Sequence, residues 1–239
     1  RSKKLVVFCH ETGADLTSWY KHAYFLPEHG VDVLTFNFQP VALAPKAESD
    51  TIYPYQWPSR KDLHCLERVL SWVAVEKKGF EVALFGVSKG ATVAAAAAPS
   101  PLIKSVMLDG AFSTRMTLQR YMKKWVNIYV STKRLSVGIP DWVYIALAYT
   151  TLMYASLKKN IRFFSIEKFI ARLKKPVFWI HAGKDSHILT DHVEALRHMI
   201  PGQTELWVAE GAGHANAVTL YPGEYSQKIV SFIDKTLKV

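Results

Sequence analysis

Val82-Ala83-Leu84-Phe85 runs directly into Gly86-Val87-Ser88-Lys89-Gly90, and the helix-forming residues 91–98 follow. A Gly-x-Ser-x-Gly pentad alone occurs by chance. A strand, the pentad and a helix in this order indicate a sharp turn that lifts the Ser88 hydroxyl above the edge of a sheet. Glycine at both ends of the pentad lets backbone segments pass without a Cβ clash. The alternative interpretation is an ordinary strand-to-helix turn that contains a serine.

Short apolar runs rich in β-forming residues recur along the chain. They predict strands at 5–8, 31–36, 82–85, 105–108, 177–180 and 205–208. Amphipathic stretches between them predict helices at 16–28, 60–76, 89–98, 190–199 and 224–237. Continuously apolar strands that alternate with helices favour an α/β fold, with a mostly parallel sheet and helices on both faces. The chemistry of such a fold lies just beyond the carboxyl ends of the strands.

The alternation breaks between Phe112 and Lys175, where roughly sixty residues replace the single helix that would suffice. This segment holds thirteen Lys or Arg and two acids, a charge of +11, which leaves about −1 for the rest of a chain whose net charge is +10. Residues 142–157 are uncharged and aromatic, but too short for the roughly twenty residues that cross a bilayer. We expect 1–111 and 176–239 to form the core, and 112–175 to form a basic, aromatic-rich helical cap.

Composition bounds the class of protein. The 239 residues, 49% of them hydrophobic, suffice for one α/β domain with an insert or at most two small domains. Two cysteines, Cys9 and Cys65, form no disulfide framework, and Cys9 is expected to be a buried small hydrophobe. The apolar run after the basic start is too short for a signal peptide. We expect a cytoplasmic or peripheral-membrane location. The alternative of a targeting segment that is removed before residue 1 stays open.

Two late segments supply partners for a serine, which needs a base to take its proton and a carboxylate to orient that base. Residues 175–185 read as a strand, a glycine turn and Asp185. Residues 210–214 read as a loop of small residues that presents His214. Asp109 also follows a predicted strand and is the alternative acid. His181, His187, His192 and His198 have no nucleophile at a suitable spacing and are interpreted as core or surface histidines.

The order Ser, Asp, His after successive strands resembles the α/β-hydrolase superfamily, among its lipase, esterase and lysophospholipase-like members. The resemblance runs from residue 5 to the C-terminus apart from the insert. It implies an α/β-hydrolase fold that lacks the first two family strands and carries a cap after the sixth. It also implies Ser88 as the nucleophile, His214 as the base and Asp185 as the acid. No cofactor is expected, and the histidines at 181–192 form no zinc-like ligand set.

The resemblance further implies an oxyanion hole built from the backbone amides of Thr12 and Lys89. Where the family usually begins this loop with His-Gly, the chain has His10-Glu11. A carboxylate at residue 11 would oppose a developing oxyanion unless it points away or pairs with a cation. We expect His10 and Glu11 to lie near the substrate, together with Trp142 from the cap.

These expectations describe a serine hydrolase that cleaves carboxylic esters of hydrophobic acyl groups, with a small-molecule acyl ester as its substrate. The basic, aromatic cap suits an anionic membrane surface as a further partner. The alternative is a cap whose apolar side covers the pocket while its lysines are solvated. No nucleic-acid module is recognisable. Two alternatives stay open. One is a non-catalytic relative that binds lipid or protein, with Glu11 marking a disabled oxyanion loop. The other is a peptidase or amidase that uses the same three residues.

Overall fold

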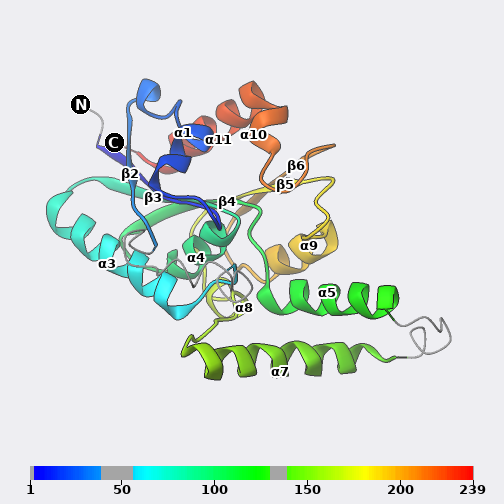
Figure 1. Ribbon diagram of the computed structural model, residues 1–239. Coiled ribbons are helices and arrows are strands. Elements are labelled where there is room, and N and C mark those ends of the chain that lie inside the picture. Colours follow the sequence, from blue (N-terminus) through cyan, green and yellow to red (C-terminus); the bar gives the residue numbers. More distant parts are fainter. Residues whose placement is uncertain (1–2, 39–55, 130–138, 239) are drawn as a thin grey trace.

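A single parallel sheet organises the chain, whose computed structural model describes residues 3–38, 56–129 and 139–238 (Figure 1). The strand order is β2-β1-β3-β4-β5-β6, and every adjacent pair is parallel. The strands are β1 (Lys4–Cys9), β2 (Val31–Thr35), β3 (Glu81–Val87), β4 (Ile103–Asp109), β5 (Val177–Ala182) and β6 (Thr204–Ala209). All six predicted strands are present, and the predicted fold class is confirmed.

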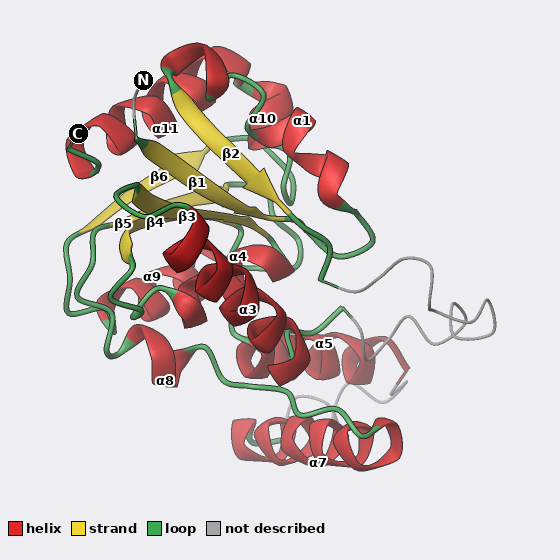
Figure 2. Ribbon diagram, turned by 90° about the vertical axis from the view of Figure 1, so that its left-hand side faces the viewer, coloured by secondary structure: helices red, strands yellow, loops and turns green. Residues whose placement is uncertain are grey.

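Helices cover both faces of the sheet (Figures 1 and 2). One face carries α1 (Trp19–His22), α10 (Ala217–Leu220) and α11 (Pro222–Thr236). The other carries α3 (Arg60–Glu76), α4 (Lys89–Ala97), α8 (Glu167–Ile170) and α9 (Thr190–His198). Two separate hydrophobic clusters fill these layers, with Trp179 buried in one and Tyr225 in the other. Burial of apolar side chains on both faces explains why the strands read as continuous apolar runs.

The order of the strands fixes where a site can form. The chain leaves β1 towards β2 at the edge, then returns to place β3 on the opposite side of β1. The connections that follow β1 and β3 therefore diverge, which opens a crevice at the carboxyl ends of these neighbouring strands. The loop that begins at His10 and the turn at Ser88 both lie at this point.

The predicted continuous helix at 16–28 is wrong. The segment consists of the 3-10 turn η1 (Leu16–Ser18), the short helix α1, and a second 3-10 turn η2 (Pro27–His29). Breaking the helix after α1 allows Ala23, Phe25 and Leu26 all to become buried beside β1 and β2. In a straight helix the Phe25 side chain would point away from the face that Ala23 and Leu26 share, so tertiary burial overrides the local preference.

The segment between β4 and β5 contains α5 (Thr114–Tyr129) and α7 (Asp141–Lys159) as well as α8. The two long helices pack against each other at one end of the molecule (Figures 1 and 2). Thr92 on α4 bonds both the N–H and the C=O of Phe112, which fixes the start of the segment. The boundaries of a separate cap at 112 and 175 stay a prediction, and residues 130–138 lie outside the described residues. No described helix is long and apolar enough to span a membrane.

The sharp turn at Ser88 depends on contact between α4 and the end of β1. A Cβ on Gly90 would lie 2.1 Å from the carbonyl oxygen of Cys9, and a Cβ on Gly86 would lie 2.5 Å from the Cα of Ala91. Every residue of α4 is buried, and most are alanines, so the helix axis approaches the sheet closely. Only glycine at positions 86 and 90 permits this approach.

We predict that Gly90→Ala destabilises the fold by about 3 kcal/mol, because the new methyl group meets backbone that cannot rotate away. The matched control is Gly223→Ala, where a Cβ meets nothing within 4 Å, and we expect it to change stability by less than about 1 kcal/mol. Urea unfolding followed by circular dichroism measures both. Equal stability of the two variants would contradict the packing described for α4.

Candidate active site

Ser88 has an unusual backbone conformation between β3 and α4. Its φ is 52° and its ψ is −117°, and its N–H donates to the carbonyl oxygen of Asp109 at 2.7 Å. A positive φ is costly for a residue with a Cβ and persists only where the surrounding structure imposes it. Here the close packing of Gly86 and Gly90 imposes it. The result is that the Ser88 side chain stands at the crevice and not in the helix.

His214 and Asp185 meet Ser88 from two other loops. The Oγ of Ser88 is 2.8 Å from Nε2 of His214, and the Nδ1 of His214 is 2.6 Å from Oδ2 of Asp185. Gly110 lies behind the imidazole with a φ of +68°, and a Cβ there would come within 3.2 Å of Cε1 of His214. The structure therefore brings together the three side chains that the sequence selected, in a continuous hydrogen-bonded chain.

Burial and charge shift the pKa values of His214 and Asp185. The Asp185 side chain is 1% exposed and that of His214 is 26% exposed. Burial by itself would lower the pKa of His214, but the hydrogen bond and charge of Asp185, with smaller contributions from Asp109 and Glu11, raise it. Burial would raise the pKa of Asp185, but His214 and the amides of His187 and Ile188 lower it. The pair thus favours an ionised carboxylate that stabilises a protonated imidazole.

Asp109, the alternative acid, faces a different group. Its carboxylate accepts a hydrogen bond from the hydroxyl of Tyr225 at 2.8 Å, and the Nδ1 of His214 is bonded to Asp185 instead. Complete burial raises the pKa of Asp109. This geometry favours Asp185 as the partner of His214 and gives Asp109 a place in the buried layer beneath the site.

The carboxylate of Glu11 is held by groups on the neighbouring turn and helix. Its Oε2 accepts a hydrogen bond of 2.6 Å from the Ser18 hydroxyl, and its Oε1 lies 3.7 Å from Nε2 of the buried His22. Burial opposes ionisation, but these contacts with His22 and Ser18 lower the pKa of Glu11 to about 2. Both oxygens are thus directed at η1 and α1, which is the arrangement that relieves the conflict expected from the sequence.

Lys89 follows the serine and is buried, although it carries a charge. Its ammonium group lies 3.0 Å from Oδ1 of Asp62 on α3, and the ring of Phe38 lies beneath it. Asp62 in turn forms a capping box with Ser59 at the start of α3. The side chain of Lys89 therefore links the turn at Ser88 to α3. Its backbone amide is the first of α4, at the end of the helix where N–H groups lack intrahelical acceptors.

A cavity of 330 Å³ opens beside Ser88 and His214. Glu11 and Thr12 line it, whereas His10 does not: its Nδ1 bonds the carbonyl of Glu11. Trp142 is also absent from the lining, because its side chain projects from α7 and is 68% exposed.

Eight residues that line the cavity are not predicted by the sequence, namely Gln56, Trp57, Phe112, Thr117, Tyr121, His187, Ile188 and Ala215. The sequence predicts His187 to be a core or surface histidine without a suitable nucleophile partner. In the structure its Nδ1 is 2.6 Å from the hydroxyl of Tyr121, and its ring lies 5.9 Å from that of His214. Because Tyr121 belongs to α5 in the insert, no spacing in the sequence could have linked the two. Only the closeness of residue 187 to Asp185 offered a signal.

Metal ligands do not gather at the site. Within the described residues, no group of three His, Cys, Asp or Glu side chains is arranged to hold an ion. His181, one of the histidines at 181–192, is buried and bonds the hydroxyl of Thr190 through Nε2.

Comparison with known proteins identifies the fold. No family model and no curated protein matches the sequence. Solved structures match nearly the whole chain: the Pyrococcus furiosus esterase Pf2001 has a TM-score of 0.68 at 21% identity, covering 99% of this chain and 83% of that one. Dienelactone hydrolase from Anabaena variabilis gives 0.67 at 15%, covering 99% and 88%. The α/β hydrolase GrgF from Penicillium gives 0.67 at 15%, covering 98% and 90%. The chain has the α/β-hydrolase fold.

We predict that the imidazole of His214 titrates above its ordinary value of about 6.5, because neighbouring carboxylates stabilise its charged form. Asp185→Asn removes the largest of these charges and should lower the pKa, whereas Asp109→Asn should lower it less. Asp191→Asn, at an exposed position on α9, is the control. NMR titration of the His214 ring protons provides the measurement, and a midpoint that does not respond to Asp185→Asn would contradict the electrostatic description.

Proposed function

We propose that the protein is a serine hydrolase that cleaves carboxylic esters through Ser88, His214 and Asp185. The single observation that supports this most is the continuous chain from the Ser88 hydroxyl through the imidazole to the Asp185 carboxylate. A nucleophile, a base within hydrogen-bond reach of it and a third group that orients the base are what nucleophilic catalysis requires. The esterases and hydrolases among the structures of the same fold are consistent with this reaction class.

The hydrogen-bonded chain from Ser88 to Asp185 gives the path of the proton in the proposed reaction. As the Oγ of Ser88 attacks the ester carbonyl carbon, its proton passes to Nε2 of His214. When the tetrahedral intermediate collapses, the bond to the alcohol oxygen breaks, and His214 returns the proton to the leaving alcohol. A water molecule then attacks the acyl group on Ser88, with His214 accepting and returning a proton once more. Asp185 stabilises the imidazolium that forms in each half of the reaction.

The oxyanion of the intermediate would be held by the backbone amides of Thr12 and Lys89. Thr12 lies in the turn after β1 and lines the cavity, and Lys89 begins α4 directly after the nucleophile. A donor of this kind is worth about 3 kcal/mol of transition-state stabilisation. The contacts of Glu11 with Ser18 and His22 keep its charge bonded elsewhere, which favours a working oxyanion loop over a disabled one.

The substrate would be an ester with a hydrophobic acyl group. Trp57, Phe112 and Ile188 give the cavity an aromatic and aliphatic wall, while Gln56 and Thr117 add polar groups to the lining. A volume of 330 Å³ is at the small end of ligand pockets. A small acyl group such as butyrate is therefore a suitable first test.

Ser88→Ala should abolish labelling by a fluorophosphonate probe and lower turnover of p-nitrophenyl butyrate at least about a thousandfold, because no other group can carry the acyl intermediate. Ser231→Ala, at an exposed position on α11, is the matched control and should react as the wild type does. Wild-type protein that neither labels nor hydrolyses p-nitrophenyl esters of any chain length would sink the proposal and favour a non-catalytic lipid- or protein-binding role. Cleavage confined to a peptide panel would favour an amidase.

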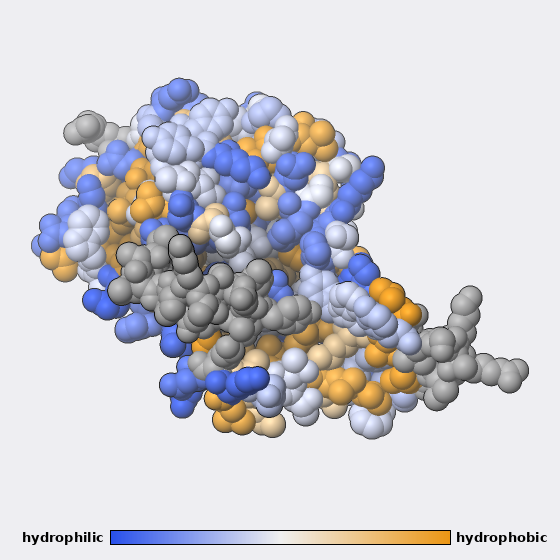
Figure 3. Space-filling model, in the orientation of Figure 1, coloured by the Kyte–Doolittle hydropathy of each residue, from blue (hydrophilic) through white to orange (hydrophobic). Residues whose placement is uncertain are grey.

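We further propose that the outer face of α5 and α7 rests on an anionic membrane surface. This face exposes large apolar side chains where a water-facing helix would carry charges: Trp142 and Leu157 on α7 are 68% and 77% exposed, and Tyr129 on α5 is 75% exposed. Figure 3 shows hydrophobic residues gathered over these two helices. Exposed cations, Lys124 and Lys158 among them, flank the apolar face. Apolar area bordered by cations suits the interface of an anionic bilayer.

We expect the wild type to co-sediment with vesicles that contain phosphatidylglycerol, and to do so less with pure phosphatidylcholine or at high salt, since basic residues contribute about 1 kcal/mol each near an anionic surface. The double variant Trp142→Ser/Leu157→Ser should lose most of this binding. Trp72→Ser/Val75→Ser removes two exposed apolar side chains from α3 and serves as the control. A double variant that still binds vesicles, or that only dissociates a dimer of the wild type, would contradict the membrane assignment.

A further inference from the structure

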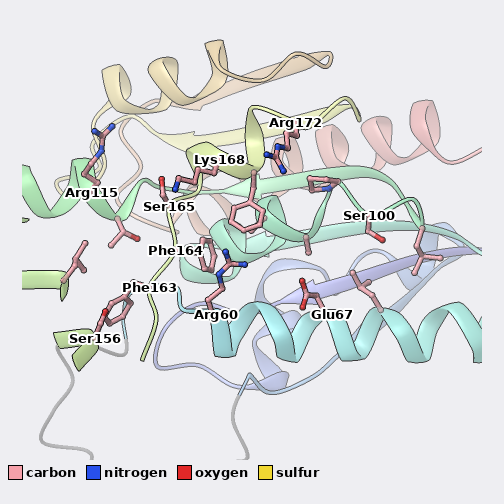
Figure 4. Close-up of a pocket in the computed structure, with 18 of the residues that line it drawn as sticks. Arg60, Glu67, Ser100, Arg115, Ser156, Phe163, Phe164, Ser165, Lys168 and Arg172 are labelled. Atoms are coloured by element: carbon pink, nitrogen blue, oxygen red, sulfur yellow. The ribbon is translucent and has the colours of Figure 1, made fainter. Parts of the chain in front are cut away.

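A second and larger cavity lies away from Ser88. It has a volume of 1240 Å³ and lies between α3, the end of α4, α7 and the segment 163–172 (Figure 4). None of the residues that line it lines the cavity at Ser88. The hydrolysis proposed above makes no use of this groove, which we call the α3–α7 groove.

Cationic side chains surround one part of the α3–α7 groove. Arg60 projects from α3, while Lys168 and Arg172 come from the opposite wall (Figure 4). The guanidinium carbon of Arg60 lies 5.4 Å from the centre of the Phe169 ring, and Phe169 lies between Lys168 and Arg172 in the sequence. Within the described residues, no carboxylate forms an ion pair with any of the three. Glu67, the acid in the lining, is 3.7 Å from His64 instead.

Apolar side chains form the rest of the groove. Leu70 on α3 and Ala97 on α4 lie on the core side, and Leu152 and Met153 on α7 lie on the facing side. Alanines at the end of α4 leave a gap that a larger side chain would fill. The combination is an apolar channel beside three cations that, in the described parts of the chain, form no ion pair with an acid. Exposed apolar area is unfavourable in water, and clustered cations attract an anion.

We propose that the α3–α7 groove binds an amphiphile that has an alkyl chain and a singly or doubly charged anionic head, a carboxylate or a phosphate. The chain would lie between Leu70, Ala97 and Leu152. The head would accept hydrogen bonds from Arg60, Lys168 and Arg172, in the charge-assisted geometry that guanidinium groups offer to carboxylates and phosphates. Binding needs no chemistry at Ser88, so the inference stands or falls independently of the proposed hydrolysis.

The test uses the full chain carrying Ser88→Ala, so that no ligand is consumed. Isothermal titration calorimetry with dodecanoate and with dodecyl phosphate, each below its micelle concentration, should show one ligand bound per chain. The two heads distinguish a carboxylate from a phosphate site. Dodecanol, which lacks the charge, and acetate, which lacks the chain, should each bind more weakly by about tenfold or more, because each forfeits one half of the contacts.

Two variants place the ligand. Arg60→Gln/Arg172→Gln removes two of the clustered cations, and Ala74→Trp fills the groove from an exposed position on α3. Each should weaken dodecanoate binding by about tenfold or more. Lys61→Gln/Arg68→Gln removes the same charge from α3 outside the groove, and Val75→Trp adds the same bulk beside it. These controls should stay within about twofold of the parent protein.

Three results would overturn the proposal. The first is that neither dodecanoate nor dodecyl phosphate binds. The second is that the groove variants Ala74→Trp and Arg60→Gln/Arg172→Gln bind dodecanoate as tightly as the control variants. The ligand would then occupy the cavity at residue 88 or the exposed face of α5 and α7. The third is dodecanol binding as tightly as dodecanoate, which would remove any role for the cations. Because Ala74 is exposed, its substitution tests the site even if the double arginine variant fails to fold.

Discussion

Contact between α4 and the carboxyl end of β1 is the constraint on which the rest of the site depends. Gly86 and Gly90 allow the helix to touch the strand, and this contact holds Ser88 at a positive φ. A strained residue of this kind costs about 1–3 kcal/mol. Burial of the whole of α4 and the buried pair between Lys89 and Asp62 offset that cost. The serine is therefore presented by packing that extends through α3, β1 and β4, and not by a local turn.

Negative charge in the layer beneath the site supports the chemistry we propose. Asp185, Asp109 and Glu11 all favour the protonated form of His214, so the imidazolium that forms during the reaction is stabilised before any substrate arrives. Each carboxylate is held by its own partners: backbone amides for Asp185, the Tyr225 hydroxyl for Asp109 and the Ser18 hydroxyl for Glu11. These bonds fix the charges in place. Glu11, whose carboxylate the sequence predicts to oppose an oxyanion unless it points away or pairs with a cation, thus belongs to the group of carboxylates that stabilises the protonated His214.

The strands and the three site residues could be predicted from the sequence because they rest on local signals. Apolar runs mark buried parallel strands, and small-residue loops after them mark the positions of Ser88, Asp185 and His214. What could not be predicted depends on contacts between distant segments. The helix expected at 16–28 is broken because Phe25 and Leu26 become buried, His187 gains a partner only because α5 brings Tyr121 to it, and the contacts of Glu11 require the fold of α1. The α3–α7 groove has no signature in the sequence, because its walls come from five separate segments.

Trapping the acyl intermediate tests the central claim most directly. Rapid mixing of the wild type with p-nitrophenyl butyrate, acid quenching and peptide mapping by mass spectrometry would locate the acyl group. We predict a burst of one p-nitrophenolate per chain and a butyryl group on Ser88. Water that His214 activates then removes this butyryl group. A burst with the acyl group on another residue, such as Cys65, or turnover without any covalent species, would contradict it.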